Sequence, residues 1–114
     1  MSKISMHQFE IMMGIDVSAH NICIEIEFYI NEDLEYNSCW LGKMGRTVEG
    51  IQYEVFWYGL VADGSQAYDY YSAEEFFNAP VFRGKSLKDL WDKVIINSID
   101  GCSVEYRLPY YLEL

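Results

Sequence analysis

Basic residues are scarce in this 114-residue chain, which carries 8 Lys and Arg against 18 Asp and Glu and has a formal net charge of −10 at pH 7. Since such a chain repels phosphate groups, we expect it to bind neither nucleic acids nor anionic membrane surfaces. It also lacks any apolar run that approaches the roughly 20 residues needed to span a bilayer. Residues 1–8 contain no apolar signal core, so we expect a cytoplasmic protein.

The sequence is equally poor in catalytic and metal-binding motifs. Its three cysteines, Cys23, Cys39 and Cys102, form no C-x-x-C pair, which excludes the usual zinc-ribbon and redox patterns. We expect all three to be reduced thiols in or near the core. No G-x-S-x-G, Walker, H-E-x-x-H or EF-hand pattern occurs, and only His7 and His20 are available as a base for a nucleophilic thiol. The sequence thus predicts no enzymatic activity, no catalytic residue, no metal ligand and no cofactor.

Apolar and aromatic side chains, by contrast, are abundant. The chain is 51% hydrophobic and contains 10 Tyr, 6 Phe and 3 Trp. This composition is far too apolar for a disordered acidic tail. No internal repeat, low-complexity stretch or linker divides the chain, and its length suits one domain. We therefore expect residues 1–114 to form a single packed domain.

The first half of the chain alternates between apolar and polar residues, which is typical of strands. Alternation predicts a strand over about 8–15 and, most clearly, one over 22–30 that is half-buried, with every second residue apolar. The turn residues 31–33 predict a hairpin whose returning strand covers 34–41. The glycine-containing stretch 42–50 fits neither dinucleotide nor P-loop spacing and predicts a mobile hairpin loop. A long strand rich in aromatic residues is expected over 51–61.

The dipeptide Asp63-Gly64 predicts a tight hairpin after this strand. A two-residue turn there would pair Ala62 with Ser65. It would also pair Trp57 with Tyr70 and Phe56 with Tyr71 across the two strands. Such aromatic cross-strand pairs each contribute about 0.2–1 kcal/mol.

Helical signals follow in the second half. Ser72 and Glu75 have the spacing of a capping box, and Pro80 ends the short helix that they open. Ser86 predicts a second helix start, with an apolar stripe at Leu87, Leu90, Trp91 and Val94. A strand over 94–99 and a hairpin at Asp100-Gly101 come next, pairing Ile99 with Cys102, Asn97 with Val104 and Ile95 with Tyr106. The apolar tail 108–112 is expected to dock on the domain, because Pro109 prevents a continued central strand.

These elements predict an α+β fold. We expect a single twisted antiparallel sheet of about six or seven strands, with two short helices between strands that pack on one face.

Acidic residues concentrate in one part of the sequence. Glu25, Glu27, Glu32, Asp33 and Glu35 lie between positions 25 and 35, and no Lys or Arg occurs between Lys3 and Lys43. One interpretation is a solvated face that keeps the protein soluble. The other is a docking surface for a basic partner, which charge complementarity would steer and select. Tyr and Trp are enriched at interface hot spots. The predicted contact residues are Glu25, Glu27, Glu32, Asp33, Glu35, Tyr36, Asp69 and Tyr70.

The segment from Tyr71 to Trp91, YSAEEFFNAPVFRGKSLKDLW, continues to Ser98-Ile99-Asp100-Gly101. It resembles C-terminal portions of small bacterial immunity proteins, which are encoded beside polymorphic toxins, including those of contact-dependent growth-inhibition systems. The resemblance covers about residues 66–102 and consists of caps, turns and a helix stripe. It implies a cytosolic protein without enzymatic activity that blocks a toxin domain, often a nuclease. It assigns no binding residue.

Three functions therefore stay open. The first is an immunity protein that neutralises a cognate toxin domain by occluding its active site or substrate groove. The second is a small enzyme or ligand-binding domain with an aromatic-lined pocket, in which Asp69 is the first carboxylate to inspect. The third is a regulatory interaction module of a mobile element. The sequence does not indicate an oligomeric state.

Overall fold

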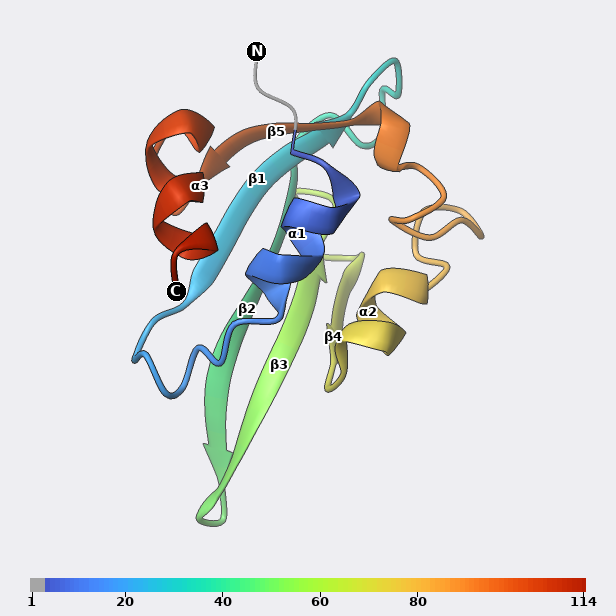
Figure 1. Cartoon of the computed structure of the whole chain (residues 1–114). Coiled ribbons are helices and arrows are strands. Elements are labelled where there is room, and N and C mark those ends of the chain that lie inside the picture. The colour runs from blue at the N-terminus through green and yellow to red at the C-terminus, as the bar shows by residue number, and fades with distance from the viewer. Residues whose placement is uncertain (1–3) are drawn as a thin grey trace.

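The computed structural model describes residues 4–114 and contains one five-stranded antiparallel sheet in the order β4-β3-β2-β1-β5 (Figure 1). The strands are β1 (Ile24–Ile30), β2 (Cys39–Val48), β3 (Ile51–Gly59), β4 (Ala67–Tyr70) and β5 (Val94–Ile99). The helices are α1 (Met6–Met13), α2 (Ala73–Asn78), α3 (Val104–Leu112) and the 3₁₀-helix η1 (Trp91–Lys93). The α+β class and the single antiparallel sheet are confirmed. The finer prediction was wrong, since these residues form five strands and three α-helices.

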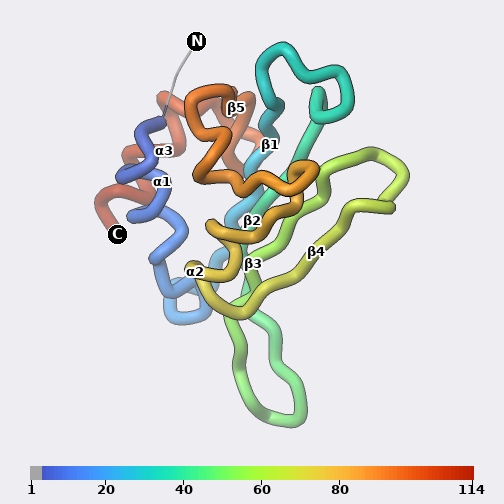
Figure 2. The backbone as a smooth tube through the Cα atoms, turned by 90° about the vertical axis from the view of Figure 1, so that its right-hand side faces the viewer, coloured from blue at the N-terminus to red at the C-terminus, as the bar shows by residue number. Residues whose placement is uncertain are grey.

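The three α-helices lie on the same side of the sheet, as the two views in Figures 1 and 2 agree. The core fills the space between this side and the helices. Phe9, Met12 and Met13 of α1 are fully buried there, as are Ile26 and Phe28 of β1. The hairpin of β2 and β3 extends beyond the helices as an arm. One face of the sheet is therefore covered by helices and the opposite face is not.

The strand predicted over 8–15 is wrong, because most of this segment forms α1. Ser5 caps the helix by accepting a hydrogen bond from the Gln8 N–H at 3.0 Å, and the Gln8 side chain reaches back to the Ser5 N–H at 3.1 Å. The buried residues Phe9, Met12 and Met13 follow a helical spacing. Ile11, which the alternating pattern places beside them, is 43% exposed.

Lys43 ties the end of α1 to the sheet, although it lies in the stretch predicted as a mobile loop. Its side chain is 3% exposed. The ammonium donates to the carbonyl oxygens of Met13 at 2.9 Å and Ile15 at 2.6 Å, and it pairs with Glu54 Oε1 at 2.8 Å. An ammonium has three donors, so each has a partner. The aromatic ring of Phe56 lies 4.7 Å from Nζ.

The strand predicted over 22–30 is confirmed by β1, whereas its hairpin partner is misplaced. Residues 34–38 belong to the loop, and β2 runs from Cys39 through most of the predicted glycine loop. One glycine of this stretch, Gly42, is required by close packing within the strand. A Cβ there would meet the Ile24 carbonyl oxygen at 2.2 Å and the Trp57 ring at 2.6 Å. The turn itself comes later, at Glu49-Gly50, where both residues have positive φ, 52° and 80°.

The strand over 51–61 is confirmed as β3, but its register with β4 is one residue away from the prediction. Phe56 faces Tyr70, and Trp57 faces Asp69. The reason lies in the loop. The Leu60 N–H donates to the Gln66 carbonyl at 3.0 Å, which closes a wider loop than a two-residue turn at Asp63-Gly64. Because side chains alternate along a strand, the shift changes which neighbours they meet.

The helix at Ser72 is confirmed as α2, with the Ser72 hydroxyl accepting from the Glu75 N–H at 3.2 Å. The second predicted helix is wrong. Ser86 and Asp89 do bond each other reciprocally, but the chain forms only turns and then η1 before β5.

The hairpin predicted at Asp100-Gly101 is confirmed only in its first pair, Ile99 with Cys102. The two further pairs are wrong, because Ser103 accepts from the Tyr106 N–H and opens α3 instead of a strand. The tail docks through buried Tyr111, whose hydroxyl donates to the Asp100 carboxylate and lies 3.3 Å from the Cys23 carbonyl oxygen.

All three cysteines are free thiols. Cys39 is buried, and burial raises the pKa of its thiol to about 12. Cys102 is partly buried. Cys23, expected in or near the core, is exposed.

Candidate protein-binding face

The face of the sheet opposite the helices is the candidate site, and we call it the open face. Strand pairing places on it the residues that alternate with the core residues of each strand. They are Glu25, Glu27 and Tyr29 from β1, Trp40, Gly42, Met44 and Arg46 from β2, Tyr53, Val55 and Trp57 from β3, Asp69 from β4, and Ile95 from β5.

Two acids of β1 stand on the open face without internal partners. Glu25 pairs across the strands with Gly42, and Glu27 pairs with Trp40. Glu25 is exposed and Glu27 is half-buried. Within residues 4–114, neither carboxylate has a hydrogen bond or an ion pair. Both charges are therefore free to meet a cation from outside.

Aromatic rings share the open face with these acids, and those of Trp40 and Trp57 lie nearest to them. Trp40 is 38% exposed and Tyr53 is 39% exposed. The ring of Trp57 covers Gly42, where only a glycine leaves room for it. The rings of Tyr53 and Tyr71 meet edge to face, with centroids 5.8 Å apart. Large amphipathic rings next to free carboxylates are a composition typical of protein interfaces that receive cationic residues.

Asp69 also lies on the open face, but it is already matched by a cation. Its Oδ2 atom is 3.6 Å from the Arg46 guanidinium, and both side chains are largely in contact with solvent. Exposed ion pairs of this kind are weak. A partner could therefore separate Arg46 and Asp69 at little energetic expense.

The acids of the β1–β2 loop have a different environment. Asp33 Oδ1 accepts from the N–H groups of Glu35 at 3.0 Å and Tyr36 at 3.3 Å. Arg83 forms ion pairs with both Asp33 and Glu35, and its guanidinium lies 4.7 Å from the centre of the Tyr36 ring. The expectation that no base offsets the acidic cluster is thus corrected, since Arg83 comes from a segment distant in sequence.

The pKa values follow from these contacts. Burial acts to raise the pKa of Asp33, but the hydrogen bonds from Arg83 and from the two backbone N–H groups outweigh it, so the pKa lies below its ordinary value of 3.8. The hydrogen bonds to Asp33 and Glu35 raise the pKa of Arg83. Asp33 is therefore held as a carboxylate that fixes the loop.

The remaining predicted residues lie elsewhere. Tyr36 is 1% exposed, its hydroxyl donates to Gln66 Oε1 at 3.1 Å, and burial raises its pKa. Tyr70 is half-buried on the helix side, with its ring centre 6.2 Å from that of Tyr58. Glu32 is exposed in the loop. The structure thus brings Glu25, Glu27 and Asp69 onto one face and separates them from Tyr36 and Tyr70.

Sequence reasoning missed Trp40 and Met44 as members of this face. Met44 lies in the stretch predicted as a loop, and Trp40 lies in the predicted strand 34–41 but was not singled out. The shared parity of Tyr53, Val55 and Trp57 was a usable signal for the neighbouring strand. Which side of that strand stays uncovered depends on where the helices pack.

The ligand-binding alternative needs a carboxylate inside an aromatic cavity. A cavity of about 500 Å³ does lie on the helix side of β4, lined in part by Tyr68, Tyr70 and Pro80. Asp69 does not line it, because it points to the open face. The carboxylate that does line it, Glu35, is paired with Arg83. Within residues 4–114, no group of three or more His, Cys, Asp or Glu side chains is arranged to hold a metal ion.

The chain matches no protein-family model, no curated protein and no solved structure. In the part of the chain that the structure describes, no helix combines the length and the apolar character needed to cross a membrane.

Proposed function

We propose that this protein is a non-enzymatic inhibitor that binds a basic toxin domain, with a nuclease as the favoured class, and blocks access to its active site or substrate groove. The observation that carries the proposal is the pair of free carboxylates, Glu25 and Glu27, beside Trp40 on an uncovered sheet face. The partial resemblance to immunity proteins supports the same function.

Charge supports a basic partner. The protein has a net charge of −10, and nuclease domains are basic where they hold phosphate. An acidic surface that enters such a groove is steered toward it at long range and competes with the nucleic acid. Because Glu25 and Glu27 have no internal partners in residues 4–114, binding would not require an existing ion pair to break.

The aromatic side chains support a specific contact. Trp40 and Tyr53 present large rings at the surface, where a partner's Arg side chains can stack. Tyr53 lies on the β2–β3 arm, which extends from the domain and can reach into a concave surface (Figure 1). Trp40 lies at the base of this hairpin, opposite Glu27. Ring stacking next to free carboxylates would recognise arginine in particular.

Co-expression with the toxin domain encoded beside its gene tests the function. We expect wild-type protein to rescue growth of cells that produce the toxin domain, and the purified pair to bind and abolish toxin activity. If the toxin domain kills equally well at matched expression of the wild-type protein, the inhibitor function is wrong.

The Glu25→Lys/Glu27→Lys double variant tests the site. Reversing both charges should weaken binding strongly, and the loss should be larger at low salt than at high salt. Glu10→Lys/Glu113→Lys is the matched control, because it changes the net charge equally on exposed residues of α1 and the end of α3. Equal losses in both double variants would show that net charge, and not the open face, governs binding.

A further inference from the structure

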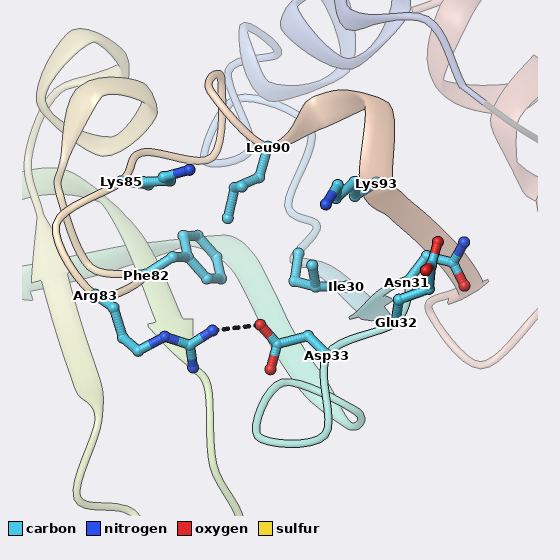
Figure 3. Close-up of a pocket in the computed structure, with 9 residues that line it drawn as sticks. All are labelled: Ile30, Asn31, Glu32, Asp33, Phe82, Arg83, Lys85, Leu90 and Lys93. Atoms are coloured by element: carbon cyan, nitrogen blue, oxygen red, sulfur yellow. Dashed lines mark hydrogen bonds and ion pairs between the residues drawn. The ribbon is translucent and has the colours of Figure 1, made fainter.

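A second feature, independent of the proposed inhibitor function, is a cavity of about 320 Å³ away from the open face (Figure 3). It lies where three segments meet: the end of β1 with the residues after it, the turn 82–85, and η1 with the residue before it. Its volume falls in the range of small-molecule sites. Ile30, Phe82 and Leu90 supply its apolar lining.

The turn 82–85 places one lysine at the cavity. Phe82 and Lys85 exchange backbone hydrogen bonds of 3.0 and 3.1 Å, and the two residues between them, Arg83 and Gly84, have φ of 51° and 88°. Residues paired in this way carry their side chains on the same side of a hairpin. The stem of Lys85 therefore runs beside Phe82, toward the cavity.

A second lysine comes from the opposite wall. The carbonyl of Lys93 accepts from the Asn31 N–H at 2.8 Å, which fixes the end of η1 against the end of β1. Figure 3 shows the ammonium groups of Lys85 and Lys93 pointing toward each other across the space that Leu90 enters. The turn 82–85 and η1, which are close in sequence, thus direct two positive charges toward one cavity.

These two cations have no close ion-pair partner in the described residues, although Lys85 interacts electrostatically with Asp89 at longer range. Neither Lys85 nor Lys93 forms an ion pair within residues 4–114, in a protein where acids outnumber bases 18 to 8. The nearby Arg83 is different, because it forms ion pairs with Asp33 and Glu35.

Three carboxylates lie at or near the cavity, namely Asp33, Asp89 and Glu32. Asp33 is bonded to Arg83, and Asp89 accepts from the Ser86 N–H at 2.9 Å. Glu32 also lines the cavity, and Figure 3 places its carboxylate on the side of Lys93. Of the charged side chains that line the cavity, Arg83 and Asp33 pair with each other, which leaves two ammonium groups and one carboxylate, Glu32.

We propose that this cavity binds the phosphate group of a small phosphate monoester, with the two lysines on the phosphate and the apolar body of the ligand on Ile30, Phe82 and Leu90. Two separate ammonium groups act as point charges and suit a tetrahedral dianion. A planar carboxylate is better matched by a single bidentate guanidinium, and Arg83 is occupied. A nucleoside monophosphate combines the dianion with a flat apolar ring of suitable size.

Titration of the purified protein at low salt with AMP, inorganic phosphate and adenosine tests the proposal. Amide chemical-shift changes should map to residues 30–33, 82–85 and 90–93, and the melting temperature should rise with ligand. AMP is expected to bind more tightly than phosphate, and adenosine not to bind. If phosphate binds as tightly as AMP, the ligand is the free ion. If neither shifts the spectrum at millimolar concentration, the proposal is wrong.

The Lys85→Gln/Lys93→Gln variant should weaken AMP binding by about tenfold or more. Lys88→Gln/Lys93→Gln is the matched control, since Lys88 is an exposed lysine of the same segment that does not line the cavity. This control should retain the part of the affinity that Lys85 supplies. Equal loss in both variants would overturn the role of Lys85, and unchanged binding in both would overturn the site.

Discussion

The acids of β1 and the acids of the loop that follows it are neighbours in sequence but differ in what they contact. Glu25 and Glu27 stand on the open face with no internal ion pair in residues 4–114. Asp33 and Glu35, a few positions later, are held by Arg83. Acidic residues that are close together in the sequence therefore need not have the same role. An acid is available to a partner only where the fold leaves it without one.

The lysines show the same contrast. Lys43 is buried and its three donors are satisfied by two carbonyl groups and Glu54. Lys85 and Lys93 have no internal ion pair in the described residues and line a cavity. In both comparisons, engaged charges should govern stability and free charges should govern binding.

The largest effect on stability is expected from Lys43→Met. It removes the charge while keeping most of the volume, and it leaves the Met13 and Ile15 carbonyls and the Glu54 carboxylate without their donor. Removing one partner of a buried pair should lower the free energy of unfolding by about 3 kcal/mol. Urea unfolding followed by circular dichroism measures it.

Arg46→Met is the matched control for Lys43. It removes the cation of the exposed pair with Asp69 from the same strand and should change the free energy of unfolding by less than about 0.5 kcal/mol. Similar losses in the two variants would contradict the expectation that burial makes the Lys43 contacts matter more for stability than the exposed pair of Arg46.

A smaller loss is expected from Asp33→Ala. This change removes the acceptor for two backbone N–H groups and for Arg83. Bonds to a charged group at a partly exposed site suggest a loss of about 1.5 kcal/mol in the free energy of unfolding. Glu32→Ala, in the same loop, has an exposed side chain and should cost much less. If the Asp33→Ala variant is as stable as Glu32→Ala, the hydrogen bonds and ion pair of Asp33 do not stabilise the loop.

The contribution of Asp33 should also depend on pH. Its pKa is lower in the folded protein than its ordinary value of 3.8, so the folded state favours the carboxylate. The stabilisation is complete above pH 3.8 and is lost as the pH falls through the folded pKa. The difference in stability between wild type and Asp33→Asn should therefore be constant near neutral pH and shrink below pH 3.8. If the difference in stability between wild type and Asp33→Asn grows as the pH falls, the pKa of Asp33 is not lowered by folding.

The smallest effect on stability is expected from Glu25→Gln/Glu27→Gln. These carboxylates have no internal partner in residues 4–114, so the free energy of unfolding should stay within about 0.5 kcal/mol of wild type. Partner binding should nevertheless fall, because the two charges are lost from the open face. A variant that loses stability and keeps its binding would reverse the comparison.

Much of the fold was predictable from local signals. β1 and β3 show regular alternation, β5 is a run of β-branched residues, and α2 begins at a Ser72 cap and ends before Pro80. Two of the failures share a cause. At 8–15 and at 103–112 the local pattern suits both a strand and a helix, and the caps Ser5 and Ser103 together with burial decide for the helix.

The candidate site was predictable only in part. Alternation placed Glu25 and Glu27 together on one side of β1. The association of Arg83 with Asp33 and Glu35 was not predictable, since it joins two loops about 50 residues apart. The face of the sheet to which Asp69 and Tyr70 point was not predictable either. It depends on the register between β3 and β4, which is shifted by the backbone hydrogen bond between Leu60 and Gln66.

By itself the sequence determined the antiparallel α+β class, the excess of negative charge and the absence of recognisable catalytic motifs, because composition and local periodicity carry these properties. The tertiary structure alone decided which acids are engaged and which are free. Ion pairs form between side chains that the fold brings within a few ångströms, whatever their separation along the chain. Placing the helices on one face of the sheet left Glu25 and Glu27 on the other, beside Trp40.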